Sequence, residues 1–297
     1  MFLSKIILTV LASTTILNAQ SLKPIDIGTR PESLTRGFDG HLFVTVMGEK
    51  KPGDAVIKRI HKDGTISIFS GGFDEPKGIA FVGDMLVVSD LGRVWAIDSN
   101  GVAKVLAHRG SFPEEIRYLN DVAAVPGENA VYVTDMGSNH LMFESPGKLW
   151  PLNSDEAKAL PSHGRVYKIN LSGEVTKVVP THPDMRNPNG VGVGLKGEIL
   201  VAGFFTGKIS AYQNDKLSLI AEGFRGADAI EQDKDGVYYI SSWTQGKVWS
   251  YDPKTKKTTV LKEGQESAAD FFFDRKARQI ICPDMVTGLL HTISLNK

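Results

Sequence analysis

The chain has 297 residues, of which 41% are hydrophobic, so it can bury a full core and is not an intrinsically disordered chain. Its 34 basic residues balance 34 acidic ones, which argues against a nucleic acid or an anionic membrane as a partner bound through overall charge. Cys282 is the only cysteine, so no intramolecular disulfide can form and packing must hold the fold together.

The N-terminal segment has the three-part layout of a secretory signal. Lys5 precedes an apolar run at 6–17, and Ala19 provides a cleavage position. The run is shorter than the roughly 20 residues that a membrane-spanning helix needs, so we expect no stable membrane insertion. We therefore predict a signal peptide at 1–19 and a periplasmic or secreted protein, with an uncleaved membrane anchor as the alternative.

Six segments of the chain repeat one pattern. Each begins with a polar residue and continues with an apolar strand, a turn rich in Gly, Asp or Asn, and a second apolar strand, which is typical of a β-hairpin. The segments lie at 30–44, 75–88, 118–133, 187–201, 226–240 and 268–282. A third strand is predicted after each hairpin, at 54–60, 92–98, 164–170, 207–213, 246–252 and 288–294.

A fourth strand follows only the first five repeats, whereas the segment 22–28 is an apolar strand that belongs to no repeat. The N-terminal strand can therefore complete the last unit and close a ring. Four-stranded units that repeat radially form a β-propeller. We predict an all-β fold, a six-bladed β-propeller of four-stranded antiparallel blades, as a single domain at 20–297. A two-sheet β-sandwich with coincidental spacing is the alternative.

Two further stretches need an interpretation within this repeat. An insertion at about 138–164 separates the second and third strands of the third blade, and we expect it to overhang the channel mouth near Trp150. The residues 192–197 spell the G-x-G-x-x-G pattern of a dinucleotide-binding loop. Such a loop requires a helix after its last glycine, but a strand follows Gly197, so we expect a hairpin turn and no nucleotide cofactor.

One polar residue opens each repeat. Because the first strand of each propeller blade lines the central channel, these six side chains should form a ring about the axis. They are Glu32, Lys77, Asn120, Asn189, Asp228 and Asp270. Carboxylate and amide oxygens are hard ligands that suit calcium or magnesium better than zinc. The ring therefore indicates a divalent cation site, and a solvated channel wall that binds nothing is the alternative.

The loops after the second strands should surround the same mouth. Acidic and aromatic residues in these loops are candidate substrate contacts, as are two members of the ring. The candidates are Asp135, Phe204 and Trp243 from the loops, with Lys77 and Asp270 from the ring. Packing between blades is the alternative role for each aromatic residue.

Several short segments resemble those of one known family. They are "RPES" (30–33), "YLNDV" (118–122), "NPNGV" (187–191), "GADAI" (226–230), "SSWTQGKV" (241–248) and "AADFFFDRKARQIICP" (268–283). In this order they resemble the SMP-30/gluconolactonase/LRE-like propellers, relatives of paraoxonases and squid-type diisopropylfluorophosphatase. The resemblance covers about residues 28–295.

The resemblance implies a site and an activity. It implies that a divalent cation, most often Ca²⁺ with Mg²⁺, Mn²⁺ or Zn²⁺ as alternatives, is held by Glu32, Asn120, Asn189 and Asp228. It also implies hydrolysis of small lactones or related esters, with Asp228 as base or nucleophile.

Two other functions stay open. One is a non-catalytic propeller that binds a small ligand or a protein partner through the same mouth. The other is a hydrolase of phosphoester or fluorophosphate type. In each case we expect a monomer without a nucleic-acid partner.

Overall fold

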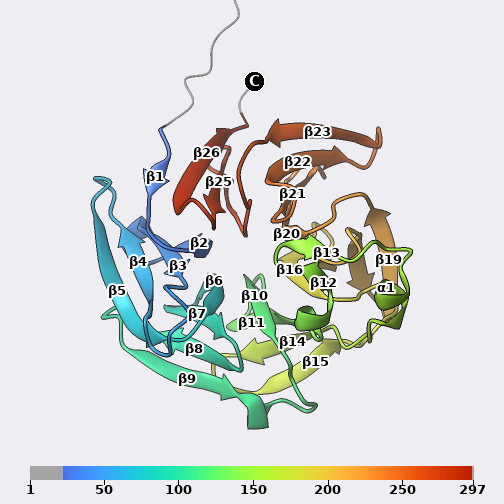
Figure 1. Ribbon diagram of the computed structural model, residues 1–297. Helices are drawn as coiled ribbons and strands as arrows, with labels where there is room; N and C mark the ends of the chain where they lie inside the picture. The colour runs from blue at the N-terminus through green and yellow to red at the C-terminus, as the bar shows by residue number, and fades with distance from the viewer. Residues whose placement is uncertain (1–22, 296–297) are drawn as a thin grey trace, which may run out of the picture.

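The computed structural model describes residues 23–295, which form six four-stranded antiparallel sheets arranged in a ring (Figure 1). The predicted all-β fold, a six-bladed β-propeller, is therefore confirmed. The predicted signal peptide at 1–19 lies outside the described residues. Across residues 23–295, no helix is long and apolar enough to cross a membrane.

Blades 1 to 5 each use four strands in chain order, from the channel outward. Blade 1 contains β2 (Pro31–Arg36), β3 (Leu42–Val46), β4 (Ala55–Ile60) and β5 (Ile66–Phe73). Blade 2 contains β6 (Pro76–Val82), β7 (Met85–Asp90), β8 (Arg93–Ile97) and β9 (Ala103–His108). Blade 3 contains β10 (Leu119–Ala124), β11 (Ala130–Asp135), β14 (Arg165–Asn170) and β15 (Val175–Val179).

Blades 4 and 5 follow the same plan. Blade 4 contains β16 (Pro188–Val193), β17 (Ile199–Gly203), β18 (Ile209–Gln213) and β19 (Lys216–Ala221). Blade 5 contains β20 (Ala227–Gln232), β21 (Tyr238–Ser242), β22 (Lys247–Asp252) and β23 (Lys257–Lys262). The glycines at 194 and 197 lie in the turn between β16 and β17, as predicted, and not before a helix.

Blade 6 joins the two ends of the described chain. Its inner strands are β24 (Phe272–Asp274), β25 (Gln279–Asp284) and β26 (Leu289–Ser294), and its outer strand is β1 (Ile25–Asp26), which pairs with β26. The predicted closure by an N-terminal strand is therefore confirmed. Because every sheet packs against a neighbour on each side, apolar side chains are buried between blades, as with Val87, Val131 and Ile169 between blades 2 and 3.

The innermost strands share a β-bulge near the channel. In blade 1, Pro31 pairs with Val46 and Leu34 pairs with Val44. Over this stretch β2 therefore contains one more residue than β3, with which it pairs. The same shift recurs in blades 2 to 5. We call the first paired residues of each inner strand, such as Pro31 and Val46, the opening pair. In blades 1 to 5, the inner-strand residue directly after this pair is the predicted ring residue.

Blade 6 departs from the predicted ring by one residue. Its opening pair is Ala268 with Asp284, so the residue that corresponds to those of the ring is Ala269, and Asp270 occupies the next position. The prediction that Asp270 belongs to the ring was therefore wrong. The run of apolar residues around Asp270 contains no proline or glycine that marks the bulge in sequence, so the nearest polar residue was assigned to the ring.

Glycines let the innermost strands approach closely. A Cβ atom added at Gly190 would lie 2.0 Å from the carbonyl oxygen of Asp228, and one added at Gly78 would lie 2.3 Å from the backbone nitrogen of Val122. A side chain at either position would push neighbouring blades apart at the channel. These glycines therefore help to hold the ring residues of adjacent blades near one another.

The insertion connects β11 to β14, as predicted. It contains a 3-10 turn (Asn139–Leu141), β12 (Phe143–Ser145), β13 (Lys148–Leu149) and α1 (Asp155–Ala159). In Figure 1 it crosses in front of β16 and β20, and its apolar side chains pack on the loops of blades 4 and 5. Arg225 donates a hydrogen bond to the carbonyl oxygen of Trp150, at 3.0 Å, and so ties the insertion to blade 5.

Candidate functional site

A cavity of about 260 Å³ opens at the end of the channel where the innermost strands begin. All six blades contribute to its walls, and the insertion supplies Met142 and Phe143. The cavity gathers seven of the predicted site residues: Glu32, Lys77, Asn120, Asn189, Phe204, Asp228 and Trp243. The expected overhang of the insertion is therefore confirmed, although its contacts with the cavity come from 139–143 and not from Trp150 itself.

Four buried oxygen atoms at this cavity accept no hydrogen bond from any residue between 23 and 295. They come from four blades and are Glu32 Oε2, Asn120 Oδ1, Asn189 Oδ1 and Asp228 Oδ1. All four side chains are at most 5% exposed. A buried acceptor without a partner is destabilising, so four of them at one cavity fit a divalent cation that would contact all four. Carboxylate and amide oxygens are the donors that calcium prefers.

Neighbouring groups orient the two asparagines. The Asn120 side-chain nitrogen contacts the sulfur of Met136 at 3.5 Å, and the Asn189 amide lies close enough to Asp228 to lower the pKa of that carboxyl. Because the amide nitrogens are directed to these partners, the amide oxygens remain as acceptors. The set contains only two carboxylates, and within the described residues no three His, Cys, Asp or Glu side chains form a metal-binding group.

Hydroxyl groups of one blade bind the backbone carbonyl oxygens of ring residues in the next blade. The Thr134 hydroxyl of blade 3 donates to the carbonyl oxygen of Asn189 at 2.7 Å, and the Ser89 hydroxyl of blade 2 donates to that of Asn120. Each hydroxyl lies on a second strand and is fully buried. Sequence reasoning missed these residues because serine and threonine are common in strands and nothing in their spacing marks a contact between blades.

The cavity raises the pKa of its carboxyl groups. Burial raises the pKa of Glu32 to about 8, against the opposing effect of Lys77 and with a further increase from Asp121. Burial and the negative charge of Glu32 raise the pKa of Asp228 well above its ordinary value. In the cation-free fold, burial therefore favours the neutral form of both carboxyl groups, and a bound cation would favour the charged form.

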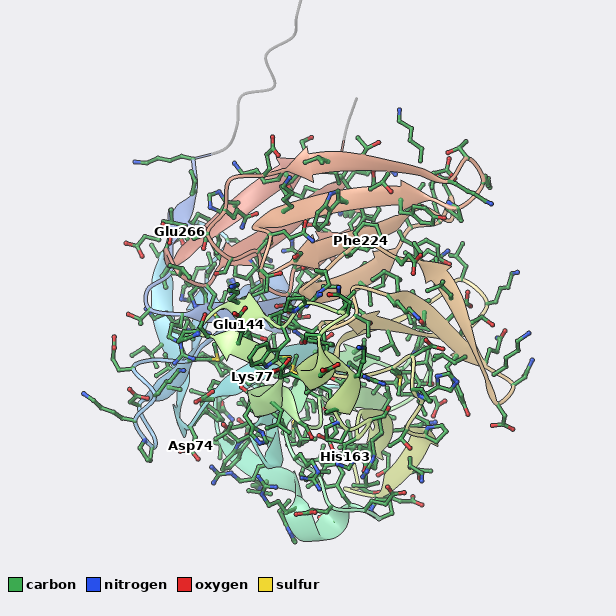
Figure 2. All side chains as sticks on the ribbon, turned by 45° about the vertical axis from the view of Figure 1, so that its right-hand side comes forward. Asp74, Lys77, Glu144, His163, Phe224 and Glu266 are labelled. Atoms are coloured by element: carbon green, nitrogen blue, oxygen red, sulfur yellow. The ribbon has the colours of Figure 1, made fainter. Side chains whose placement is uncertain are left out.

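Lys77 is the one basic residue of the predicted ring. Its ammonium lies 3.4 Å from the Glu75 carboxylate, 3.4 Å from the Met47 sulfur and 4.9 Å from the centre of the Tyr118 ring. Burial opposes its charge, but Tyr118, Glu32 and Glu75 together raise its pKa. Figure 2 places Lys77 near the middle of the view.

Aromatic side chains form the opposite wall. The Phe143 and Phe204 rings lie 6.3 Å apart, and the Phe204 and Trp243 rings lie 6.2 Å apart. The indole nitrogen of Trp243 is buried and has no hydrogen-bond partner in the part of the chain that the structure describes. The predicted roles of Phe204 and Trp243 in lining the mouth are consistent with this placement.

Asp135 does not line the cavity. It is fully buried, and its carboxylate accepts hydrogen bonds from the backbone nitrogens of Arg117, Tyr118 and Gly137 at 2.9–3.2 Å. The structure therefore gives Asp135 a role in fixing the loop before β10, in place of the predicted substrate contact. Asp90 and Asp284 hold the corresponding loops of blades 2 and 6 in the same way.

Asp270 lies at a second cavity, of about 250 Å³, lined by the far parts of the same innermost strands. It accepts a hydrogen bond from the Ser33 hydroxyl, and the nearby Asp121 carboxylate raises its pKa. Burial raises the pKa of Asp121 to about 6 and that of Asp270 well above its ordinary value. The structure thus separates Asp270 from the four-oxygen site, and its predicted contact with a substrate at the mouth was wrong.

The cavity also contains residues that sequence reasoning missed. Arg30, Lys50 and Glu75 line it, as do the sulfur-containing side chains of Met136, Met142 and Met285. Arg30 lies two residues before Glu32, so its proximity to the ring could have been noted. The methionines carry no polar signal, and only the packed fold shows that they converge.

Comparisons with known proteins support the fold. No family model and no curated protein matches the sequence. A gluconolactonase from Xanthomonas campestris is 18% identical, with 90% of this chain and 87% of that chain covered at a TM-score of 0.67. A luciferin-regenerating enzyme is 11% identical, with coverage of 92% and 95% and a TM-score of 0.67.

A virginiamycin B lyase from Staphylococcus aureus is also similar, at 15% identity, with coverage of 89% and 80% and a TM-score of 0.60. These structures therefore share one architecture while their names give three different activities. At such identities the likeness concerns the fold, and function has to be argued from the site. The chain is a six-bladed β-propeller whose solved structural neighbours include a gluconolactonase and a luciferin-regenerating enzyme.

Proposed function

We propose that the protein is an exported hydrolase of lactones or related esters that depends on a divalent cation, with Ca²⁺ as the cation favoured by the donor set. The observation that carries this proposal is the convergence on one cavity of four buried oxygens that have no hydrogen-bond partner within residues 23–295. Export rests on the N-terminal sequence alone. Likeness to a gluconolactonase fold is consistent with the reaction class.

In this proposal, Glu32, Asn120, Asn189 and Asp228 hold the cation, which when bound would polarise the carbonyl of the substrate. The two carboxylates provide charge, and the two amide oxygens complete the protein ligands without adding further repulsion. Calcium takes roughly 6 to 8 oxygens, so a set of four protein donors leaves room for water and substrate.

We assign the role of general base or nucleophile to Asp228. As a general base it takes a proton from water while the water oxygen forms a bond to the acyl carbon. The bond from the acyl carbon to the ring oxygen then breaks, the ring oxygen takes up a proton, and a hydroxy acid is released. As a nucleophile, the Asp228 carboxylate forms that bond first and water releases the acyl group in a second step. Burial and Glu32 raise the pKa of Asp228 in the cation-free fold, and a bound cation would lower it and so favour the carboxylate form that either role needs.

Chelation tests the proposed reaction. Protein purified with its cation should hydrolyse members of a panel of five- and six-membered lactones, lose that activity on dialysis against a chelator, and regain it when calcium is added. Hydrolysis that persists after complete removal of divalent cations would overturn the cation-dependent mechanism. Cation binding without turnover of any lactone or ester would favour the alternative of a non-catalytic propeller.

The stability of the cation-free protein should depend on pH through Glu32. In the unfolded chain its carboxyl titrates at the ordinary 4.5, and in the fold its pKa is about 8. Between these values the folded state holds a proton that the unfolded chain has released, so this contribution to stability is present below the unfolded pKa and is lost as pH rises to about 8. A bound calcium ion would offset the negative charge of Glu32 in place of this proton. It should therefore raise Tm more at about pH 8 than at about pH 5 in thermal unfolding of dialysed protein.

A further inference from the structure

The two sides of the cavity differ in chemistry. Basic side chains from blades 1 and 2 line one side: Arg30, Lys50 and Lys77. Aromatic side chains from the insertion and from blades 4 and 5 line the other: Phe143, Phe204 and Trp243. Blades 1 and 2 lie across the channel from blades 4 and 5 (Figure 1), so a compound at the centre would contact both sides at once.

The charge of the cavity changes when a cation is bound. Three basic residues and three carboxylates line it, and the carboxylates are Glu32, Glu75 and Asp228. A divalent cation would offset the charges of Glu32 and Asp228. Among the described residues that line the cavity, Glu75, which pairs with Lys77, would then remain as the one carboxylate not offset by the cation, beside three basic groups. The loaded cavity would carry a net positive charge.

The backbone holds two of these basic residues in an unfavourable conformation. Arg30 has φ of 59° and Lys50 has φ of 63°, in the left-handed region that side chains with a Cβ rarely occupy. The Arg30 guanidinium also donates to the carbonyl oxygen of Gly48 at 3.4 Å, which fixes it against the loop between β3 and β4. Seven other non-glycine residues among those described share this region of φ, so it fixes the direction of the chain at Arg30 and Lys50 and is not specific to the cavity.

The aromatic side offers an apolar surface with one hydrogen-bond donor. Phe143, Phe204 and Trp243 form a continuous series of ring contacts. The buried indole N–H of Trp243 has no acceptor among residues 23–295. A buried donor without a partner is destabilising, so this group fits an oxygen atom of a bound compound. The wall therefore suits an alkyl or aryl group that carries an acceptor nearby.

We propose that the compound accepted by this site is an amphiphilic anion. Its lactone or ester group lies at the four oxygens, its carboxylate lies against Arg30 and Lys50, and its apolar part lies against Phe204 and Trp243. This assignment of substrate class rests on the proposed function. A neutral polyhydroxylated sugar lactone has neither the anionic nor the apolar part, and it is therefore expected to be a poor substrate.

A pair of matched lactones tests the proposal. Both carry the same alkyl arm, and a second substituent is a carboxylate in one and its neutral amide in the other. For the calcium-loaded protein, kcat/KM should be higher for the carboxylate by about tenfold or more, and added salt should reduce this preference. The double variant Arg30→Gln/Lys50→Gln should bring the ratio of the two kcat/KM values to about one. The exposed Lys234→Gln variant, which removes a similar charge far from the cavity, should keep the wild-type ratio.

Binding of the corresponding pair of non-hydrolysable lactams, measured by calorimetry, separates the two proposals. Equal kcat/KM for both lactones together with equal lactam affinities would overturn the amphiphilic-anion class and leave the hydrolase proposal standing. Absence of lactone hydrolysis, with a lactam preference that disappears in the double variant, would overturn the hydrolase proposal and support the ligand class. A lactam preference that survives in the double variant would show that the carboxylate contacts the cation and not Arg30 and Lys50, which also overturns the proposal.

Discussion

Replacement of Asp228 by asparagine should abolish most hydrolysis while leaving the fold intact. The substitution keeps the shape of the side chain but removes the proton acceptor and one of the two charges that hold the cation. We expect kcat/KM to fall by about 10³-fold or more, and calcium affinity to fall by about tenfold or more. Lactone hydrolysis and calcium titration of the same preparation measure both effects.

The stability of this variant gives a second, independent result. Burial and Glu32 raise the pKa of Asp228, so the cation-free fold favours the neutral form of this side chain. Asparagine resembles that neutral form. The cation-free Asp228→Asn protein should therefore unfold at a Tm equal to or above that of the cation-free wild type near pH 8, although its activity is lost. Asp84→Asn, at an exposed turn, is the matched control and should behave as wild type. Full activity in Asp228→Asn would contradict the proposed role.

Replacement of Asp135 by alanine should lower the free energy of unfolding, in contrast to Asp228→Asn. Three backbone N–H groups, from Arg117, Tyr118 and Gly137, would lose their acceptor. A buried donor left unsatisfied costs about 1–3 kcal/mol, so the free energy of unfolding should fall by roughly 3 kcal/mol or more. Thermal unfolding should register a decrease in Tm of roughly 5 °C or more.

Asp84→Ala is the matched control for this substitution and should leave Tm within about 1 °C of wild type. The comparison also separates the structural role of Asp135 from the predicted contact with substrate. A variant with unchanged Tm and a greatly raised KM would show that Asp135 binds substrate and that its hydrogen bonds contribute little to stability.

The architecture could be predicted from the sequence because each blade repeats the same pattern of strands and turns. Period-two apolar strands, turn residues and a displaced N-terminal strand together determine the number of blades and the closure at β1 and β26. The ring residues of blades 1 to 5 follow because each stands directly after the opening pair of its strand. Predictions of this kind depend on local pattern, which a sequence displays directly.

The errors in the predicted site have a different physical origin. Asp270 was misplaced because the residue directly after the Ala268–Asp284 pair is the apolar Ala269, so the polar pattern pointed to the next residue in the chain. Asp135 was misassigned because an acidic residue after a strand serves equally well to bind ligand or to accept backbone hydrogen bonds. The contribution of Arg30 and Lys50 to the cavity depends on backbone angles that only the folded chain reveals.

Calcium titration by calorimetry, on protein freed of divalent cations, tests the central claim most directly. Wild type should bind calcium at one site per chain. Asn189→Ala removes one of the four oxygens and Glu32→Gln removes one of the two negative charges, so each should weaken binding by about tenfold or more. Glu231→Gln, which alters a carboxylate at the second cavity, should bind calcium as wild type does. Absence of calcium binding in wild type, or undiminished binding in both ring variants, would contradict the assignment of the four oxygens as a cation site.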